Sequence, residues 1–113
     1  MHAHVDSLQP VFRALSDPTR RQILADLDQS EWTVADVAAR HAMTRVAVRK
    51  HLTVLEQGGL IDIRPEGRER RITLRPARLK AAHDWLGEFS RFWDDRLAAL
   101  KTAVESENER DEP

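Results

Sequence analysis

The most constraining feature of this chain is the stretch from Thr33 to Leu74, in which the spacing of the apolar residues changes along the chain. Two short segments with helical spacing come first and meet at a tight turn, His41-Ala42-Met43. Two alternating segments follow, at residues 60–63 and 71–74, and a Pro- and Gly-containing turn at 65–68 separates them. This order predicts two helices that meet at a turn, followed by a two-stranded hairpin.

Two more helices are expected before this stretch. Residues 1–5 are expected to fray, and an amphipathic helix is then indicated by apolar residues three and four apart, namely Val5, Leu8, Val11, Phe12 and Leu15. Asp17 is a good N-cap for the second helix, and Pro18 fits its first turn. Its inner face carries Ile23, Leu24 and Leu27, and its outer side carries Arg20 and Arg21.

Capping residues mark the ends of the third and fourth helices. Thr33 starts the third, with Asp36 three residues later as a variant of the capping box, and Val34, Val37 and Ala38 facing inward. Thr44 caps the fourth helix, which is expected to run to about Gln57. Gly58-Gly59 then supplies a left-handed stop.

A last long helix is expected to open at Pro76 and to reach about Val104. One broad stripe of it is apolar and contains Leu79, Ala82, Leu86, Phe89, Trp93, Leu97, Leu100 and Val104, with Trp85 and Phe92 widening it. The acidic segment 105–113 has no apolar residue and is expected to be disordered. The predicted fold is mainly α with a small β-hairpin: a winged helix-turn-helix of five helices and a two-stranded wing in residues 1–104.

Composition excludes several classes of protein. The 113 residues suit one domain, and the absence of cysteine excludes disulfides and thiolate metal sites. No apolar stretch approaches about 18 residues and no signal-peptide pattern opens the chain, so we expect a soluble, cytoplasmic protein without a membrane partner. No glycine-rich phosphate loop, nucleophile elbow or facing acid/base pair is present, so we expect no enzyme. The histidines lack metal-ligand spacing, so neither a metal nor a cofactor is predicted.

Charge is distributed unevenly along the chain. Residues 40–80 contain 11 Lys and Arg against 4 Asp and Glu, a balance of +7, whereas the remainder has a balance of −8. A basic block on an otherwise acidic protein is typical of a surface that meets nucleic acid.

The fourth helix carries the predicted contact surface for double-stranded DNA. Val48, Leu52 and Leu55 share its inner side, and the opposite side is basic, with Arg45, Val46, Arg49, Lys50 and Thr53. Arginine can donate two hydrogen bonds to guanine, and small apolar groups can touch a thymine methyl. The free N–H groups of the helix N-terminus, beside Thr44, can hold a phosphate.

Further contacts are expected from the wing and from the second helix. Arg68 and Arg70 stand near the wing tip with Arg71, while Glu66 and Glu69 dilute the positive charge. We therefore expect Arg68 and Arg70 to position the DNA backbone more than to identify bases. Arg20 is a candidate for a phosphate contact at the flank of the site.

The apolar stripe of the last helix is broader than one small domain needs. We therefore expect it to pair, with help from the first helix, with the same helix of a second subunit. A two-fold dimer presents two reading helices one DNA turn apart, ~34 Å.

Three pieces of the sequence resemble the ArsR-like (arsenic-repressor) family of bacterial winged-helix regulators: LSDPTRRQIL, TVADVAARHAMTRVAVRKHLTVLEQGGLI and EGRERR. The resemblance covers about residues 8 to 104. It implies a homodimeric repressor whose terminal helices form the dimer and whose DNA is released by an effector, often a metal ion. The family's thiolate site cannot exist here, and of its site on the last helix only His83 and Asp84 remain nearby, so the chain resembles a branch that does not sense metals. The family often has Ser where this chain has Arg49, and usually Gly where it has Ala42.

These observations favour a homodimeric repressor that binds a pseudo-palindromic operator. Two alternatives remain open. One is a repressor that responds to a metal or small ligand through the region of His83 and Asp84. The other is a winged-helix module that binds proteins and has no DNA role. The sequence identifies no effector ligand.

Overall fold

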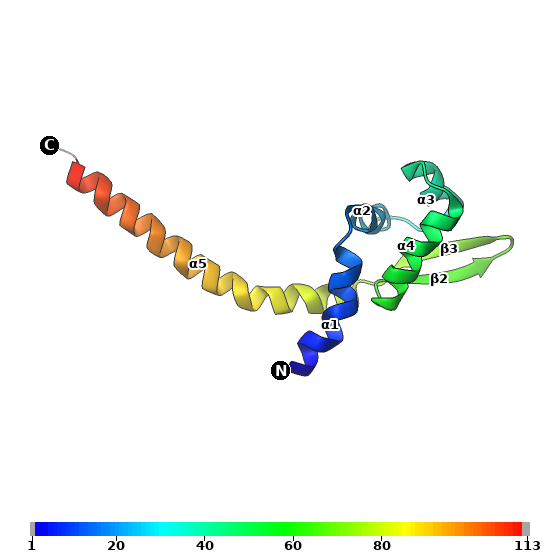
Figure 1. Ribbon diagram of the computed structural model, residues 1–113, viewed down its shortest axis with the longest axis horizontal. Helices are drawn as coiled ribbons and strands as arrows, with labels where there is room; N and C mark the ends of the chain where they lie inside the picture. Colours follow the sequence, from blue (N-terminus) through cyan, green and yellow to red (C-terminus); the bar gives the residue numbers. More distant parts are fainter. Residues whose placement is uncertain (1, 112–113) are drawn as a thin grey trace. The chain divides into compact units, whose positions relative to one another are not determined.

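Residues 2–111 are described by the computed structural model, with their side chains over 7–89 and 94–107. This part of the chain contains the five expected helices and three short strands (Figure 1). Helices α1 to α4, all three strands and the start of α5 belong to one unit, Met1–Ala82, and the rest of α5 belongs to a second, His83–Pro113.

The first two helices are α1 (His2–Leu15) and α2 (Pro18–Asp26). Helix α1 already begins at His2, so the prediction that residues 1–5 fray is wrong from His2 onward; no proline or glycine interrupts the chain before Pro10. Asp17 caps α2 as predicted, because its carboxylate accepts the backbone N–H of Arg20 at 3.0 Å. That hydrogen bond to the charged form lowers the pKa of Asp17.

Helices α3 (Val34–His41) and α4 (Arg45–Gln57) form the helix-turn-helix. The predicted capping box is present: the Thr33 hydroxyl accepts the backbone N–H of Asp36 at 3.1 Å, and the Asp36 carboxylate accepts that of Thr33 at 3.0 Å. The hydrogen bond from the Thr33 backbone lowers the pKa of Asp36. Ala42 makes the turn in the left-handed conformation, with φ +51°.

The end of α4 differs slightly from the prediction. Gly58 closes the helix in a right-handed conformation, with φ −75°, and Gly59 alone, with φ +69°, supplies the left-handed residue. The Leu60 N–H then reaches back to the carbonyl of Leu55 at 3.1 Å, which closes the helix end.

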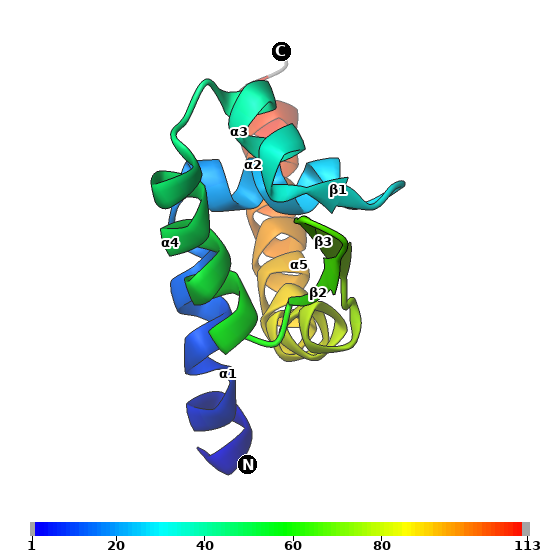
Figure 2. The same cartoon turned by 90° about the vertical axis from the view of Figure 1, so that its right-hand side faces the viewer.

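Three antiparallel strands form a sheet in the order β1-β3-β2. The wing consists of β2 (Ile61–Glu66) and β3 (Glu69–Leu74), and the unpredicted β1 (Trp32–Thr33) pairs with β3 just before α3 begins (Figure 2). The predicted turn at 65–68 is shorter than expected: both strands continue to a two-residue loop, Gly67-Arg68. Pro65 is accommodated because β2 is an edge strand, on which a missing N–H can face outward.

The core lies where α1 to α4 meet the base of the sheet, and the inner residues predicted for α2 and α4 are all buried. On α1, Leu8 and Val11 are buried, whereas Phe12 and Leu15 are half-buried. Helix α4 contacts α1, α2, α3 and β2, so its orientation is set by all of them. The largest fully buried side chains are Val11, Ile23, Val37, Val48, Leu52, Leu55, Leu60, Ile61 and Ile72.

Helix α5 (Ala77–Asp111) is longer than predicted. The segment Glu105–Asp111, expected to be disordered as part of the 105–113 tail, is helical, and the last two residues of that tail, 112–113, lie outside the described chain. Glutamate and arginine are good helix formers, and Lys101 and Glu105 form an ion pair one turn apart at 4.0 Å. Over the described residues, no helix is long and apolar enough to cross a membrane.

The strained turn gives a first test. Because a side chain in the left-handed conformation is unfavourable, Ala42→Gly is expected to raise the free energy of unfolding by up to about 1 kcal/mol. The same substitution at Ala39, an exposed residue inside α3, is expected to lower it by about 0.5–1 kcal/mol. Urea unfolding of both variants measures the two signs, and equal signs would contradict a strained turn.

Candidate nucleic-acid interface

The outward face of α4 is basic along its length. Val48, Leu52 and Leu55 are buried, as predicted, which leaves the opposite side in solvent. That side carries five of the predicted contact residues, all exposed: Arg45, Val46, Arg49, Lys50 and Thr53. Val46 is 60% exposed although it is apolar. An exposed valine among cations suits contact with a thymine methyl.

The N-terminus of α4 has the features of an anion site. The Thr44 hydroxyl oxygen accepts the N–H of Ala47 at 3.1 Å, and its carbonyl accepts the N–H of Val48 at 3.0 Å. The N–H groups of Arg45 and Val46, in the same first turn, have no intrahelical acceptor. With the helix dipole, these groups favour a phosphate at this end.

Thr53 is less free than the sequence suggested. Its hydroxyl donates to the carbonyl of Arg49 at 2.9 Å, so the hydroxyl is used inside the helix. A base contact by Thr53 therefore rests on its methyl group.

The register of the wing separates its arginines into two sets. Pro65 pairs with Arg70 and Ile63 with Ile72, so these side chains share one face of the hairpin, whereas Arg64 and Arg71 share the other. Arg71 is engaged by a hydrogen bond to Glu66 and by Glu31 at 3.6 Å. The Glu66 bond and charge raise the pKa of the Arg71 guanidinium.

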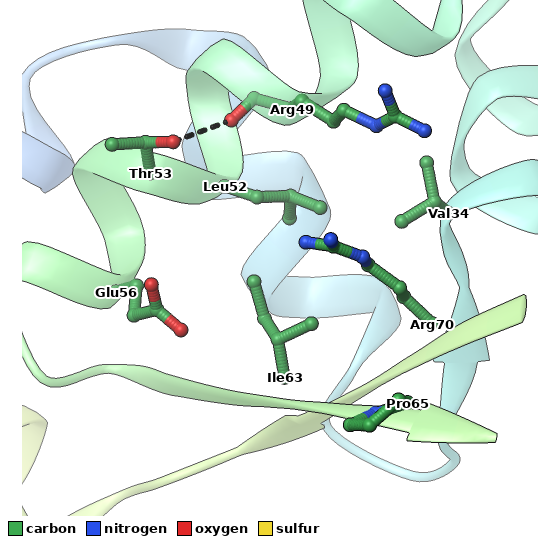
Figure 3. A pocket seen from close by; sticks show the side chains of 8 residues that line it. All are labelled: Val34, Arg49, Leu52, Thr53, Glu56, Ile63, Pro65 and Arg70. Carbon is green, nitrogen blue, oxygen red and sulfur yellow. Dashed lines mark hydrogen bonds between the residues drawn. The ribbon is translucent and has the colours of Figure 1, made fainter.

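The α4-facing side of the wing and α4 enclose a groove of about 410 Å³. Arg49 enters it from α4 and Arg70 from β3, so the groove brings together two residues predicted separately (Figure 3). Its other lining residues are Val34, Leu52, Thr53, Glu56, Ile63 and Pro65.

Four of the predicted cations are available for a ligand. Among the described side chains, no hydrogen bond or ion pair occupies those of Arg49, Lys50, Arg68 and Arg70. Arg45 lies 3.8 Å from Glu69 of the wing, an exposed pair. The pair lies between the start of α4 and the wing tip, and it is a contact that sequence reasoning did not find.

Arg20 makes contacts within the protein that the sequence did not predict. Its Nε donates to the carbonyl of Ala14 and its Nη2 to that of Arg13, both at 2.9 Å, and Nη1 lies 3.3 Å from His51 Nδ1. The guanidinium thus closes the carboxyl end of α1 and contacts α4. We therefore propose that Arg20 is a positioning residue, and its contact with a DNA phosphate stays a prediction.

Salt dependence separates these two roles of Arg20. Arg20→Gln is expected to lower the free energy of unfolding by about 1–2 kcal/mol, because hydrogen bonds to two carbonyls are lost. The dependence of DNA affinity on salt is expected to stay unchanged, whereas loss of a phosphate contact would reduce its slope by about one. Arg21→Gln, which removes only one carbonyl bond of 2.7 Å, is the matched control with a smaller loss. A reduced salt slope for Arg20→Gln would show that Arg20 does contact a phosphate.

The histidines whose side chains are described each lie near a single carboxylate. His41 Nε2 lies 2.8 Å from Asp26 at the turn, and His83 lies 3.5 Å from its neighbour Asp84 on exposed α5. No group of three or more potential ligands gathers in the part of the chain with described side chains.

Comparison with known proteins agrees with this architecture. A family described as "Helix-turn-helix domain" matches residues 15–64. The transcriptional repressor SdpR of Bacillus subtilis is 31% identical over 87 residues, which cover 77% of this chain and 97% of SdpR. The regulator Rv2034 of Mycobacterium tuberculosis is 33% identical over 98 residues, or 87% and 89% of the two chains.

A solved structure extends the match over almost the whole chain. The ArsR-like transcriptional regulator from Rhodococcus sp. RHA1 is 36% identical, covers 94% of this chain and 97% of its own, and superposes with a TM-score of 0.75. The chain belongs to the ArsR family. As a member of that family it is a DNA-binding transcriptional regulator and not an enzyme.

Proposed function

We propose that this ArsR-family member is a cytoplasmic homodimeric repressor that binds a pseudo-palindromic operator. The observation that carries the proposal is the outward face of α4, on which Arg49 and Lys50 are exposed and have no partner among the described residues. No acidic residue occurs between Arg40 and Leu55 to repel a phosphate.

In this proposal α4 lies in the major groove. Arg49 donates to a guanine, Val46 and the Thr53 methyl touch thymine methyl groups, and Lys50 meets a phosphate. Thr44 and the first N–H groups of α4 hold a second phosphate. Arg45 exchanges its exposed contact with Glu69 for the DNA backbone, which costs little because exposed ion pairs are weak.

The wing contributes positioning. Arg68 sits in the exposed two-residue loop at the tip, and Arg70 lies on the α4-facing side of the hairpin. We propose that Arg68 contacts the DNA backbone or the narrow minor groove beside the site. We propose that Arg70 contacts the DNA strand that lies between the wing and α4.

The apolar stripe of α5 supports the dimer. Five of its side chains are about half exposed or more: Leu86 at 52%, Phe89 at 47%, Leu97 at 59%, Leu100 at 61% and Val104 at 49%. Trp93 and Phe92 lie outside the described side chains. Such a contiguous apolar surface marks an interface, and we propose that a second copy of α5, together with α1, covers it.

Repression is proposed from two kinds of support. SdpR is named a transcriptional repressor, and it is similar to this chain over nearly its whole length. A dimer bound across an operator also occupies DNA that other proteins need.

Selection from a random DNA duplex pool, followed by affinity measurements against salt, tests the proposal. We expect an enriched inverted repeat with half-sites about one helical turn apart. Binding without enrichment would contradict operator recognition. No binding at low salt would favour the alternative of a protein-interaction module.

A further inference from the structure

We propose that the groove between α4 and the wing binds a small organic carboxylate with an aromatic body, and that this ligand competes with DNA. The competition rests on the proposed operator binding, whereas the ligand site itself does not.

Two guanidinium groups provide the charge for an anion. Arg49 and Arg70 extend from different elements toward the same space, and neither side chain has a partner among residues 2–111 (Figure 3). A guanidinium offers a fork of N–H donors that matches a carboxylate, and two forks from opposite walls can hold it from both sides. Arg70 shares one face of the hairpin with Ile63 and Pro65, and all three line the groove opposite α4.

The lining of the groove is mixed polar and apolar, and its apolar side chains can contact a hydrocarbon body behind the charge. Leu52 is 2% and Val34 4% exposed, so both are held by the core, and Ile63 and Pro65 add apolar surface from β2. The volume of about 410 Å³ lies in the range of small-molecule sites. An aromatic body fits further, because arginine stacks on aromatic faces.

Glu56 orients the ligand. It lies on the same groove and is exposed, and its carboxylate repels a second negative charge. The site therefore favours a monoanion over a dianion, with the charge beside the arginines and the neutral body elsewhere in the groove.

Competition with DNA follows from the shared residues. Arg49 cannot donate to a guanine and to a carboxylate at once, and a body filling the groove blocks the DNA strand from Arg70. Because coupling between two ligands is reciprocal, bound operator lowers the affinity for the carboxylate by the same factor by which bound carboxylate lowers the affinity for the operator.

Binding of naphthoate to the full chain without DNA tests the site. Proton–nitrogen correlation spectra are recorded during titration with naphthoate, with naphthylmethanol, which lacks the charge, and with inorganic phosphate, which lacks the apolar body. We expect saturable shifts with naphthoate that cluster on the outward face of α4, around Val34 and along β2 and β3. Scattered or absent shifts would overturn the proposal, and so would equal affinity for naphthylmethanol or for phosphate.

Two variants of the wing give a matched pair. Arg70→Gln is expected to weaken naphthoate about tenfold, because one charged hydrogen-bonding group is lost. Arg64→Gln removes the same charge from the other face of the hairpin, outside the groove, and is expected to leave naphthoate affinity unchanged. Both should keep the unfolding midpoint of the unmodified chain. Equal effects of the two variants would show that general charge, and not the groove, binds the anion.

A final competition experiment links the site to regulation. Naphthoate is expected to raise the apparent dissociation constant of the selected operator, in proportion to the naphthoate affinity of each variant. Naphthoate binding without this competition would overturn the regulatory part alone. Failure of operator selection in the absence of naphthoate would instead contradict the proposed function, so the two failures are distinguishable.

Discussion

Replacing Leu97 and Leu100 together with lysine is expected to convert the proposed dimer to a monomer and to weaken operator binding by about a hundredfold to a thousandfold. Both side chains are about 60% exposed on the apolar stripe of α5. Lysine supports a helix about as well as leucine, so α5 should keep its helical content. The loss therefore reflects two changes: like charges face each other across the dimer, and the second half-site no longer benefits from the first.

Sedimentation velocity and operator titration measure these effects. Thr102→Lys is the matched control, because Thr102 is exposed on the side of α5 opposite the stripe. It is expected to remain dimeric with unchanged operator affinity. A double variant that stays dimeric would show that α5 does not form the dimer, and a monomer with full affinity would remove the need for a dimer on DNA.

Arg49→Ala is expected to reduce the free energy of DNA binding by about 1–3 kcal/mol through one base pair of each half-site, and to relax specificity at that position. The reason is geometric, since the exposed Arg49 guanidinium has the donors for a guanine and has no partner among the described residues. Lys50→Ala, at the next residue of α4, is expected to weaken binding to every DNA sequence alike and to reduce the salt slope by about one.

A panel of single-base operator variants, titrated at several salt concentrations, separates the two residues. Arg64→Gln serves as the control for lost charge, because Arg64 pairs with Asp62 at 3.2 Å on the far side of the wing. If Arg49→Ala weakened every sequence equally, Arg49 would be a phosphate contact and another residue would have to select the base.

Local signals in the sequence are enough to predict where helices α2, α3 and α4 begin. The caps Asp17, Thr33 and Thr44 act within three residues of themselves, so their effect is visible in sequence alone. The inner and outer faces of α4 follow from helical periodicity for the same reason. Strand β1 was missed because two residues have no periodicity, and Trp32 is a strand residue only through its pairing with Ile72.

The role of Arg20 depended on the fold. Nothing near Arg20 in the sequence shows that its guanidinium reaches the carbonyls at the end of α1 and a histidine 31 residues away on α4. The groove was missed likewise, because it exists only once the hairpin register places Arg70 opposite Arg49. Helix α5 is longer than the sequence predicts, because the helix propensity of Glu105–Asp111 outweighs the disorder that its acidic composition indicates.

The pairing of β1 with β3 has a consequence for how binding starts. Trp32 and Thr33 pair with Ile72 and Arg71, so the middle of the wing is hydrogen-bonded to the residues that open α3. The stem of the hairpin is therefore ordered during folding, together with the helix-turn-helix. The conformational entropy of ordering that stem has already been lost when DNA arrives, so it does not reduce affinity. The encounter then requires little rearrangement of the backbone, and association should be limited by diffusion and charge.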